Sequence, residues 1–410
     1  MSETGGAHSS QVDLPPVGAG SRVAGRWPFQ RRRRATASML RLATASLFLA
    51  GAAAKISLLT LDDWRTVQYA TEPRVAPAVL EAPAVPKSPA TGAPPSGGIL
   101  VAEFAPMEAV LVRYPLGLPA SLVAAFSKDI KVVVLCRSAV QPEAKSVLVG
   151  AGAVGQNLTF VDVRTDSYWT RDYGPWYVGS EVTGNWSIVD FDYNRPRPHD
   201  NKVSQQLAAL WNVPYANSGL TLTGGNMMGD GNGVGSATYL VYEDNDCGSQ
   251  PCAKVDDTMK SFYGIDKFLT LADPTGNYIE HMDCWGKFLS EKDVLVDRPG
   301  VTSRYRKQYD GAAAFFERSG WTVHRVDIAG DDAYSNSLLL NGKAYVPISA
   351  SSTPNAADKA ALAVYQEALP GYDVVGVAAD PNHPWENTDA LHCRTRGLPK
   401  APPAAWPSLA

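Results

Sequence analysis

The feature that most constrains the fold is a series of short β-rich segments, some of them separated by helix-like stretches. The β-rich segments are residues 131–136, 158–163, 187–193, 238–243, 267–273, 321–326, 337–348 and 373–377, and the helix-like stretches are 202–211, 255–263, 305–318 and 356–369. Asn341-Gly342 predicts a type I′ hairpin turn within 337–348. Because helices alternate with at least one hairpin, we expect a mixed α/β domain and not a purely parallel sheet.

The boundaries of that domain follow from composition. Residues 73–98 are rich in proline, alanine and glycine without a repeat, which is typical of a linker. We therefore predict a leader over residues 1–54, a linker over 55–98 and a catalytic domain over 99–410. About 300 residues are long enough to bury one sizeable core.

The leader carries a targeting signal. Four arginines, residues 31–34, precede an uncharged, mostly apolar run, Leu42–Ala54. That run is shorter than the about 20 residues that span a bilayer, and the alanines that end it resemble a signal-peptidase site. We predict secretion, with a membrane anchor over residues 35–61 as the alternative. The only membrane contact expected is through this segment, and the net charge of −4 gives no indication of nucleic-acid binding.

The chain has five cysteines, so a secreted form keeps at least one free thiol. Cys247 and Cys252 bracket a short loop that a disulfide could close. Cys393 lies in "DALHCRTRG", between a histidine and two arginines. We expect this polar and cationic setting to favour the thiolate, the reactive form of cysteine.

Other polar residues lie in segments that border the β-rich runs. Asp172 follows an arginine in "SYWTRDYGPW", His281 and Asp283 stand two apart in "HMDCWGK", and Asn336 precedes an apolar strand. Positions i and i+2 of an extended segment share a face, so His281 and Asp283 could line one pocket. Taken singly, each has a structural explanation, because histidine and turn-forming aspartate are common without catalysis.

Six strings in one order distinguish this chain. They are "SYWTRDYGPW", "NRPRP", "GGNMM", "HMDCWGK", "NSLLLN" and "DALHCRT", and they span about residues 167–395. The set resembles the bacterial-type peptidylarginine deiminases, members of the guanidine-modifying superfamily that also contains agmatine and arginine deiminases. The resemblance implies a five-bladed, pseudo-symmetric α/β propeller, the pentein fold, built of ββαβ units with the site at its centre.

The resemblance also implies a role for each polar residue. Cys393 would be the nucleophile, His281 the general acid and base, Asp172 and Asp283 the pair that holds the substrate guanidinium, and Asn336 a residue that orients the site. A guanidinium is a flat fork of N–H donors that carboxylates match bidentately, and a thiolate is a strong nucleophile for its central carbon. We expect arginine to become citrulline plus ammonia through a covalent thiouronium, without a metal, calcium or redox cofactor.

The other end of the substrate is predicted from "NRPRP". Composition alone favours a solvated basic loop, because charged residues are mostly exposed. The resemblance implies instead that Arg195 and Arg197 bind the C-terminal carboxylate of a peptide ending in arginine, while Trp169 and Ile279 flank the arginine side chain. The expected partners are therefore arginine-containing peptides or proteins.

Three alternatives remain open. An agmatine deiminase, or another small-guanidine deiminase, is the closest; agmatine has no carboxylate, and agmatine enzymes usually continue "HC-x-T-Q-Q" where this chain reads "HCRTRG". A cysteine hydrolase or amidotransferase acting on amides is disfavoured, because paired aspartates would repel the oxyanion of its transition state. An inactive binding protein is disfavoured because every matching catalytic position is filled.

Overall fold

The computed structural model describes residues 87–94, 96–180, 185–276, 279–349, 353–381 and 384–399. They all belong to one compact unit, Leu59–Ala410. The predicted leader and most of the predicted linker lie outside the described residues, so both stay predictions. Within the described residues, no helix has the length and apolar character needed to cross a membrane.

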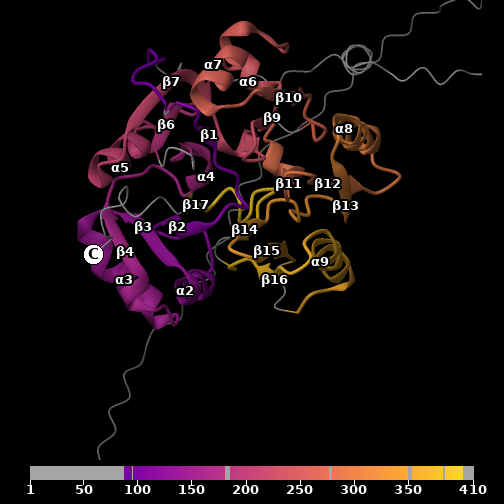
Figure 1. Ribbon diagram of the computed structural model, residues 1–410. Coiled ribbons are helices and arrows are strands. Elements are labelled where there is room, and N and C mark those ends of the chain that lie inside the picture. Colours follow the sequence, from indigo (N-terminus) through magenta and orange to yellow (C-terminus); the bar gives the residue numbers. More distant parts are fainter. Residues whose placement is uncertain are drawn as a thin grey trace, which may run out of the picture. The chain divides into compact units, whose positions relative to one another are not determined.

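The described strands form five small, separate sheets (Figure 1). The sheets are, each in spatial order: β1 (Ile99–Leu100), β5 (Tyr177–Ser180), β6 (Asn185–Tyr193), β7 (Tyr215–Leu222); β10 (Lys267–Leu271), β9 (Val234–Thr238), β8 (Met228–Gly229); β11 (Gly286–Phe288), β12 (Asp293–Pro299), β13 (Thr322–Ile328); β14 (Leu338–Leu340), β15 (Lys343–Ile348), β16 (Asp373–Ala378); and β17 (Arg396–Pro399), β2 (Met107–Arg113), β3 (Lys131–Cys136), β4 (Leu158–Asp162).

One connection pattern recurs in all five sheets. An antiparallel pair is followed by a helix and then by a strand parallel to the second of the pair, as in β11, β12, α8 and β13. In the last sheet, strands from opposite ends of the described chain, β17 and β2, form the antiparallel pair. The helices are α2 (Ala120–Asp129), α3 (Gln141–Gly150), α4 (Thr170–Tyr173), α5 (Val203–Trp211), α6 (Leu240–Glu243), α7 (Ala253–Tyr263), α8 (Arg306–Ser319) and α9 (Ala356–Ala368). The mixed α/β prediction is confirmed. The structure repeats one strand–strand–helix–strand unit, although the amino-acid sequence shows no matching repeat.

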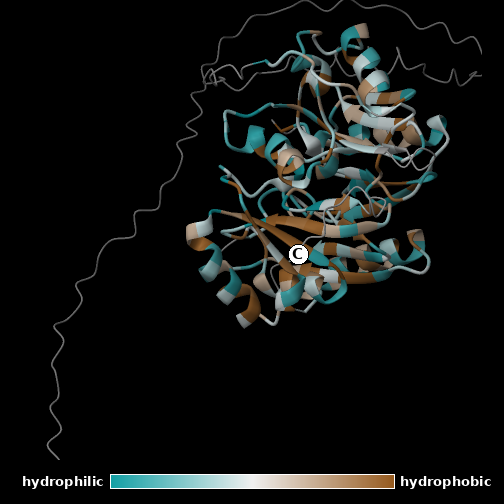
Figure 2. Cartoon of the chain, turned by 60° about the vertical axis from the view of Figure 1, so that its left-hand side comes forward, coloured by the Kyte–Doolittle hydropathy of each residue, from teal (hydrophilic) through white to brown (hydrophobic). Residues whose placement is uncertain are grey.

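Helices α2, α3, α5, α7, α8 and α9 lie on the outer sides of the sheets, while α4, β11, β14 and β17 lie toward the middle (Figure 1). Strand β3 shows why the segment 131–136 reads as one apolar run. Val132 and Val134 pack with Phe126 of α2, whereas Val133 and Leu135 face a second core on the other side of the sheet. A strand buried on both faces has no polar alternation. Figure 2 shows the matching contrast, with brown strands and helices of mixed colour.

One local prediction is confirmed, and one pairing that the sequence left open is present. Asn341 and Gly342 connect β14 to β15 with φ angles of 48° and 78°, the left-handed conformation that a type I′ turn requires at both positions. Cys247 and Cys252 are joined by a disulfide, with their Cα atoms 6.1 Å apart.

The strand predicted over residues 238–243 is wrong. Strand β9 ends at Thr238, and after Tyr239 the residues Leu240–Glu243 form the single helical turn α6. The Thr238 hydroxyl accepts a hydrogen bond from Leu240 N at the start of the turn, and the Asn245 side chain donates to Val241 O. These contacts with the segments before and after the turn override the β preference of its residues.

Candidate active site

The candidate site is built from short turns and loops at the ends of strands in different sheets. Asp172 lies in α4, Gly225 in the 3₁₀ turn η4 (Gly224–Asn226), and Asp283 in the 3₁₀ turn η5 (Met282–Cys284). These three turns are in mutual contact through η4. The loops before β14 and β17 contribute Asn336 and Cys393. Loops carry the functional groups while the sheets fix their positions.

Asn336 holds the loop that carries Cys393. Its side-chain oxygen accepts hydrogen bonds from Cys393 N at 3.2 Å and Ala390 N at 3.0 Å. Its side-chain nitrogen donates to Cys393 Sγ at 3.1 Å and to Asp283 O at 3.1 Å. Asn336 is fully buried, so all four bonds are shielded from water. One side chain therefore sets both the backbone and the sulfur of Cys393.

His281 lies between the two carboxylates. Its Nδ1 is 3.7 Å from Asp172 Oδ1 and 4.0 Å from Asp283 Oδ1. Cys393 Sγ is 3.4 Å from the other oxygen of Asp283. Gly225 lets these groups approach its backbone closely, since a Cβ there would lie 2.6 Å from His281 Nδ1 and 2.8 Å from Asp172 Oδ1.

Two polar atoms of the side chains around Gly225 are buried and make no hydrogen bond with any described residue. They are Asp172 Oδ1 and His281 Nε2. Buried polar atoms are almost always hydrogen-bonded, and an exception points to an absent water or ligand. A carboxylate oxygen accepts and cannot donate when it is ionised, so the missing partner of Asp172 is a donor.

Burial and charge set the protonation of the three acid–base groups. Burial and the neighbouring Asp283 raise the pKa of Asp172 to about 7. Burial lowers the pKa of His281 to about 4, so the imidazole is neutral at neutral pH. Burial alone would raise the pKa of Asp283, but the hydrogen bond and charge of His392 outweigh it and lower that pKa. The site thus holds a permanent carboxylate, a titrating carboxyl group and a neutral base.

The expectation that neighbouring cations favour the Cys393 thiolate is wrong for the substrate-free chain. A hydrogen bond with Cys284, burial and the Asp283 carboxylate raise the pKa of Cys393 well above its usual value. The sequence neighbour Arg394 is engaged elsewhere, because its guanidinium pairs with Asp389 at 2.8 Å. A resting thiol therefore needs a cation or a base in the site before it can ionise.

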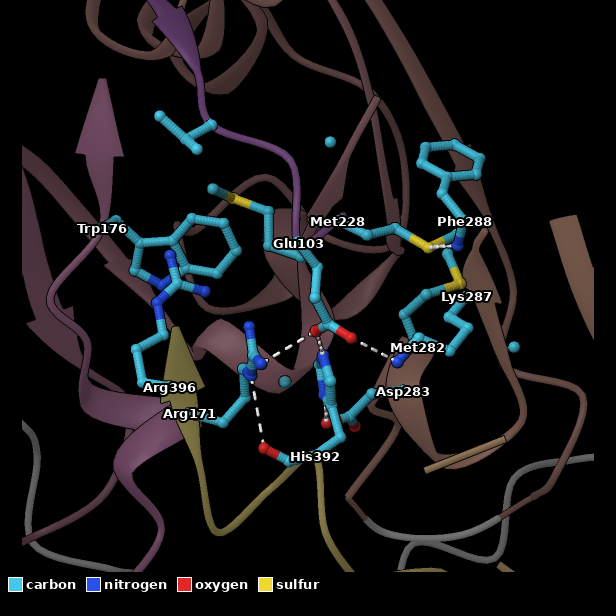
Figure 3. A pocket seen from close by; sticks show the side chains of 15 residues that line it. Glu103, Arg171, Trp176, Met228, Met282, Asp283, Lys287, Phe288, His392 and Arg396 are labelled. Carbon is cyan, nitrogen blue, oxygen red and sulfur yellow. Dashed lines mark hydrogen bonds and ion pairs between the residues drawn. The ribbon is translucent and has the colours of Figure 1, made fainter. Parts of the chain in front are cut away.

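A buried ion network that the sequence analysis missed supports Asp283 (Figure 3). His392 donates from Nδ1 to Asp283 at 2.7 Å and pairs through Nε2 with Glu103. Glu103 also pairs with Lys287 at 2.6 Å and with Arg171 at 2.8 Å. Each ring nitrogen of His392 therefore faces a carboxylate. His392 bridges the site to the buried ions of the core.

The network borders a cavity of about 30 Å³, which has room for one or two water molecules. Glu103, Lys287, Arg396 and Asp283 are among its lining residues, whereas Cys393 and His281 are not. The cavity therefore lies behind Asp283, away from the thiol. Lys287 and His392 belong to the motifs "HMDCWGK" and "DALHCRT", which offered a signal for them; Glu103, in "VAEFAP", had none.

The predicted substrate-binding residues lie around the same site. The Arg197 guanidinium stacks over the Trp169 ring, 4.3 Å from its centroid, and donates to the Tyr193 hydroxyl at 2.8 Å. That hydroxyl donates in turn to Asp172 at 3.1 Å. Arg195 is half-buried and acts electrostatically on Asp172. Ile279 is half-buried two residues before His281.

One group of metal-ligating side chains gathers in the described part of the chain, formed by Asp283, Cys284 and Cys393. Thiolates select soft metal ions. An ion held there would occupy the sulfur that the predicted chemistry needs as its nucleophile. The donor set therefore fits a thiol site and not a resident metal cofactor.

Comparison with known proteins identifies the family. The model of the Porphyromonas-type peptidyl-arginine deiminases matches residues 101–399. The chain belongs to this family. It is a member of a group of arginine and guanidine deiminases, which hydrolyse carbon–nitrogen bonds.

The relatives of this family member include proteins that are named for other activities. The agmatine deiminase of Pseudomonas fluorescens is 22% identical over 54% of this chain and 72% of its own length. A Yersinia pseudotuberculosis protein is 22% identical over 74% and 96%. Two solved structures share the fold. The agmatine deiminase of Enterococcus faecalis has a TM-score of 0.63 at 18% identity, covering 76% of this chain and 99% of that chain. A Porphyromonas gingivalis protein has a TM-score of 0.63 at 21%, covering 74% and 98%.

Proposed function

We propose that the protein hydrolyses a substrate guanidinium to a ureido group and ammonia, with Cys393 as a covalent nucleophile. The observation that carries this is the close grouping of two carboxylates and His281 around Gly225. Asp172 Oδ1 lacks a donor there, and a guanidinium supplies donors in a flat fork. We further propose that the five sheets are the five blades of one α/β propeller around this site.

The steps follow from the protonation states. A bound guanidinium adds the cation that the resting site lacks, which favours ionisation of Asp172 and of the Cys393 thiol, with His281 as the proton acceptor. The thiolate forms a C–S bond with the guanidinium carbon. His281 then returns the proton to the departing nitrogen, the C–N bond breaks, and ammonia leaves a thiouronium. His281 next takes a proton from water, the hydroxide attacks the same carbon, the C–S bond breaks, and the released thiolate takes the hydroxyl proton, which leaves a neutral ureido group and the resting thiol. The proton on His281 passes to the solvent.

Two substrate classes remain, each with support. The names of the curated relatives and of one solved structure support agmatine, whereas the family itself and the Porphyromonas gingivalis structure are named for peptidyl-arginine and arginine. The two arginines next to Asp172 support a peptide that ends in arginine. Arg195 and Arg197 are half-buried beside Asp172, where they would attract a carboxylate and repel the distal ammonium of agmatine.

The deciding experiment measures ureido product and ammonia from the full chain with three substrates. These are agmatine, a peptide ending in arginine, and the same peptide with an amidated C-terminus. Turnover that Cys393→Ala abolishes and Cys136→Ala retains would support the mechanism, since Cys136 is a buried thiol in another part of the core. Preference for the free carboxylate would select the peptide, and preference for agmatine the small guanidine. No turnover of any substrate would reject the function.

A further inference from the structure

A second free thiol lies against the proposed nucleophile. The sulfur atoms of Cys284 and Cys393 and an oxygen of Asp283 all lie within 4.8 Å of one another. Each thiol is at most 4% exposed. The other free cysteine of the described residues, Cys136, packs with α2 and β3 in a different core cluster. The reactive thiol therefore has a near partner of its own kind.

The positions of the two cysteines permit a bond between them. A disulfide needs its sulfur atoms about 2.05 Å apart, so these two must approach by less than about 3 Å. Cys284 is the last residue of the single turn η5, and Cys393 lies in the loop before β17. Neither lies inside a regular helix or strand, so rotation of the side chains and a small loop shift disturb no hydrogen-bond ladder.

We propose that Cys284 and Cys393 form an oxidative modification site, in which a hydroperoxide converts the two thiols into a disulfide and a thiol reductant restores them. The loss of activity on oxidation rests on the proposed function, because it needs Cys393 as the nucleophile. Formation of the disulfide does not rest on it. Cys284 has no part in the proposed deimination and acts here as the resolving cysteine.

The chemistry balances in two steps. Cys393 gives its proton to His281, its sulfur attacks one oxygen of the hydroperoxide, an S–O bond forms, the O–O bond breaks, and the leaving oxygen takes the proton back from His281. Cys393 is now a sulfenic acid. Cys284 sulfur then attacks Cys393 sulfur, an S–S bond forms, the S–O bond breaks, and hydroxide leaves with the Cys284 proton as water. The thiols lose two electrons and two protons to hydrogen peroxide, which becomes two water molecules.

The neighbouring thiol changes the fate of the oxidised enzyme. A sulfenic acid without a partner is oxidised further to a sulfinic acid, which thiol reductants do not reverse. Capture by Cys284 stops the oxidation at a reversible stage. The pair thus makes oxidation of the nucleophile reversible. While the disulfide is present, the Cys393 sulfur cannot attack a guanidinium.

The test uses the full chain, reduced and then freed of reductant, and titrated with hydrogen peroxide. Peptide mapping without reduction should find a 284–393 crosslink, and the two peptides that it joins should together be about 2 mass units lighter than their free forms. Deiminase activity should fall in parallel and return at least about tenfold with dithiothreitol. The Cys247–Cys252 disulfide gives a separate crosslink in the same map.

Two cysteine-to-alanine variants test whether the effect depends on Cys284 in particular. Cys284→Ala should be inactivated by peroxide but not rescued by dithiothreitol, with a sulfinic acid at Cys393, and Cys136→Ala should behave as the unmodified chain does. Each is compared with its own activity before oxidation. A sulfinic acid at Cys393 with Cys284 still free in the unmodified chain would overturn the proposal. A crosslink in a protein without deiminase activity when reduced would keep the site and reject the proposed function.

Discussion

The side-chain nitrogen of Asn336 donates a hydrogen bond to Cys393 Sγ at 3.1 Å, while its oxygen accepts from Cys393 N. A donor aimed at the sulfur stabilises the thiolate more than the thiol. The bond therefore strengthens as the nucleophile forms. In the resting chain this donor is opposed by the contact with Cys284, by burial and by Asp283, which raise the pKa of the Cys393 thiol well above its usual value.

We expect Asn336→Asp to lower kcat by about 100-fold, comparable to removal of one donor from an oxyanion hole. The variant keeps the shape and the accepting oxygen but replaces the donor with an acceptor that repels the thiolate. The control is Asn245→Asp, because Asn245 is also buried and donates to two carbonyls away from the site. Both variants should lose stability, and only Asn336→Asp should lose activity per folded molecule. Equal kcat values for the two would contradict this role.

The pH dependence of kcat/KM should have an acidic limb near pH 7. The pKa of Asp172 is raised to about 7 by burial and by Asp283. Below that pH the carboxyl group is protonated and accepts fewer donors from the guanidinium, so kcat/KM falls as the pH falls. Because the two aspartates interact, the apparent pKa belongs to the pair.

The matched test of that limb is Tyr193→Phe. The Tyr193 hydroxyl donates to Asp172 and so stabilises its charged form; its removal should raise the apparent pKa and move the limb to higher pH. Tyr215→Phe removes the same type of bond from Asp190, away from the site, and should leave the limb in place. A limb that moves equally in both variants would show that Asp172 does not set it.

How far the sequence predicts the fold depends on where the stabilising contacts lie. Strand β3 could be predicted to the residue, because burial on both faces leaves an uninterrupted apolar run. Turn α6 could not, since Asn245 and Thr238 decide its conformation from outside it. The sheet formed by β17 and β2 joins the two ends of the described chain, a pairing that no local pattern contains.

The same limit applies to the site. Polar motif residues could be found from the sequence, and the structure brings Cys393, His281 and Asp283 together. Their electrostatics could not be found, because sequence neighbours are not spatial neighbours. Arg394 follows Cys393 but pairs with Asp389. Glu103 comes from a segment without a motif and yet sets the charge state around His392.

Glu103→Gln should lower the free energy of unfolding by about 3–5 kcal/mol, the usual effect of breaking a buried ion pair from one side. It leaves Lys287, Arg171 and His392 without their shared carboxylate. Glu108→Gln is the control, because its pair with Lys131 is half-exposed and such pairs contribute about 0–1 kcal/mol. Urea denaturation measures both.

The pH dependence of stability offers a second readout for Glu103. Burial would raise its pKa, but the charges of His392, Lys287 and Arg171 outweigh burial and lower it well below 4.5. A depressed pKa in the folded state means that the contribution is present above the pKa of the unfolded chain and is lost as the pH falls below it. The difference between the unmodified chain and Glu103→Gln should therefore shrink below about pH 4.5. A constant difference would contradict the assigned charge.

Gly225→Ala tests the proposed binding position of the substrate guanidinium directly. The new Cβ would lie 2.6 Å from His281 Nδ1, 2.8 Å from Asp172 Oδ1 and 3.1 Å from Asp283 Oδ1. The new Cβ therefore displaces these three side chains. A shift of about 1 Å at a reacting centre changes the rate by roughly 100-fold. We expect at least that loss in kcat/KM, with the midpoint of urea denaturation changed little. The same change at Gly300, where a Cβ meets nothing within 4 Å, should leave both quantities unchanged. If Gly225→Ala retains full turnover, the guanidinium must bind elsewhere, and the roles proposed for Asp172 and His281 would fall with that result.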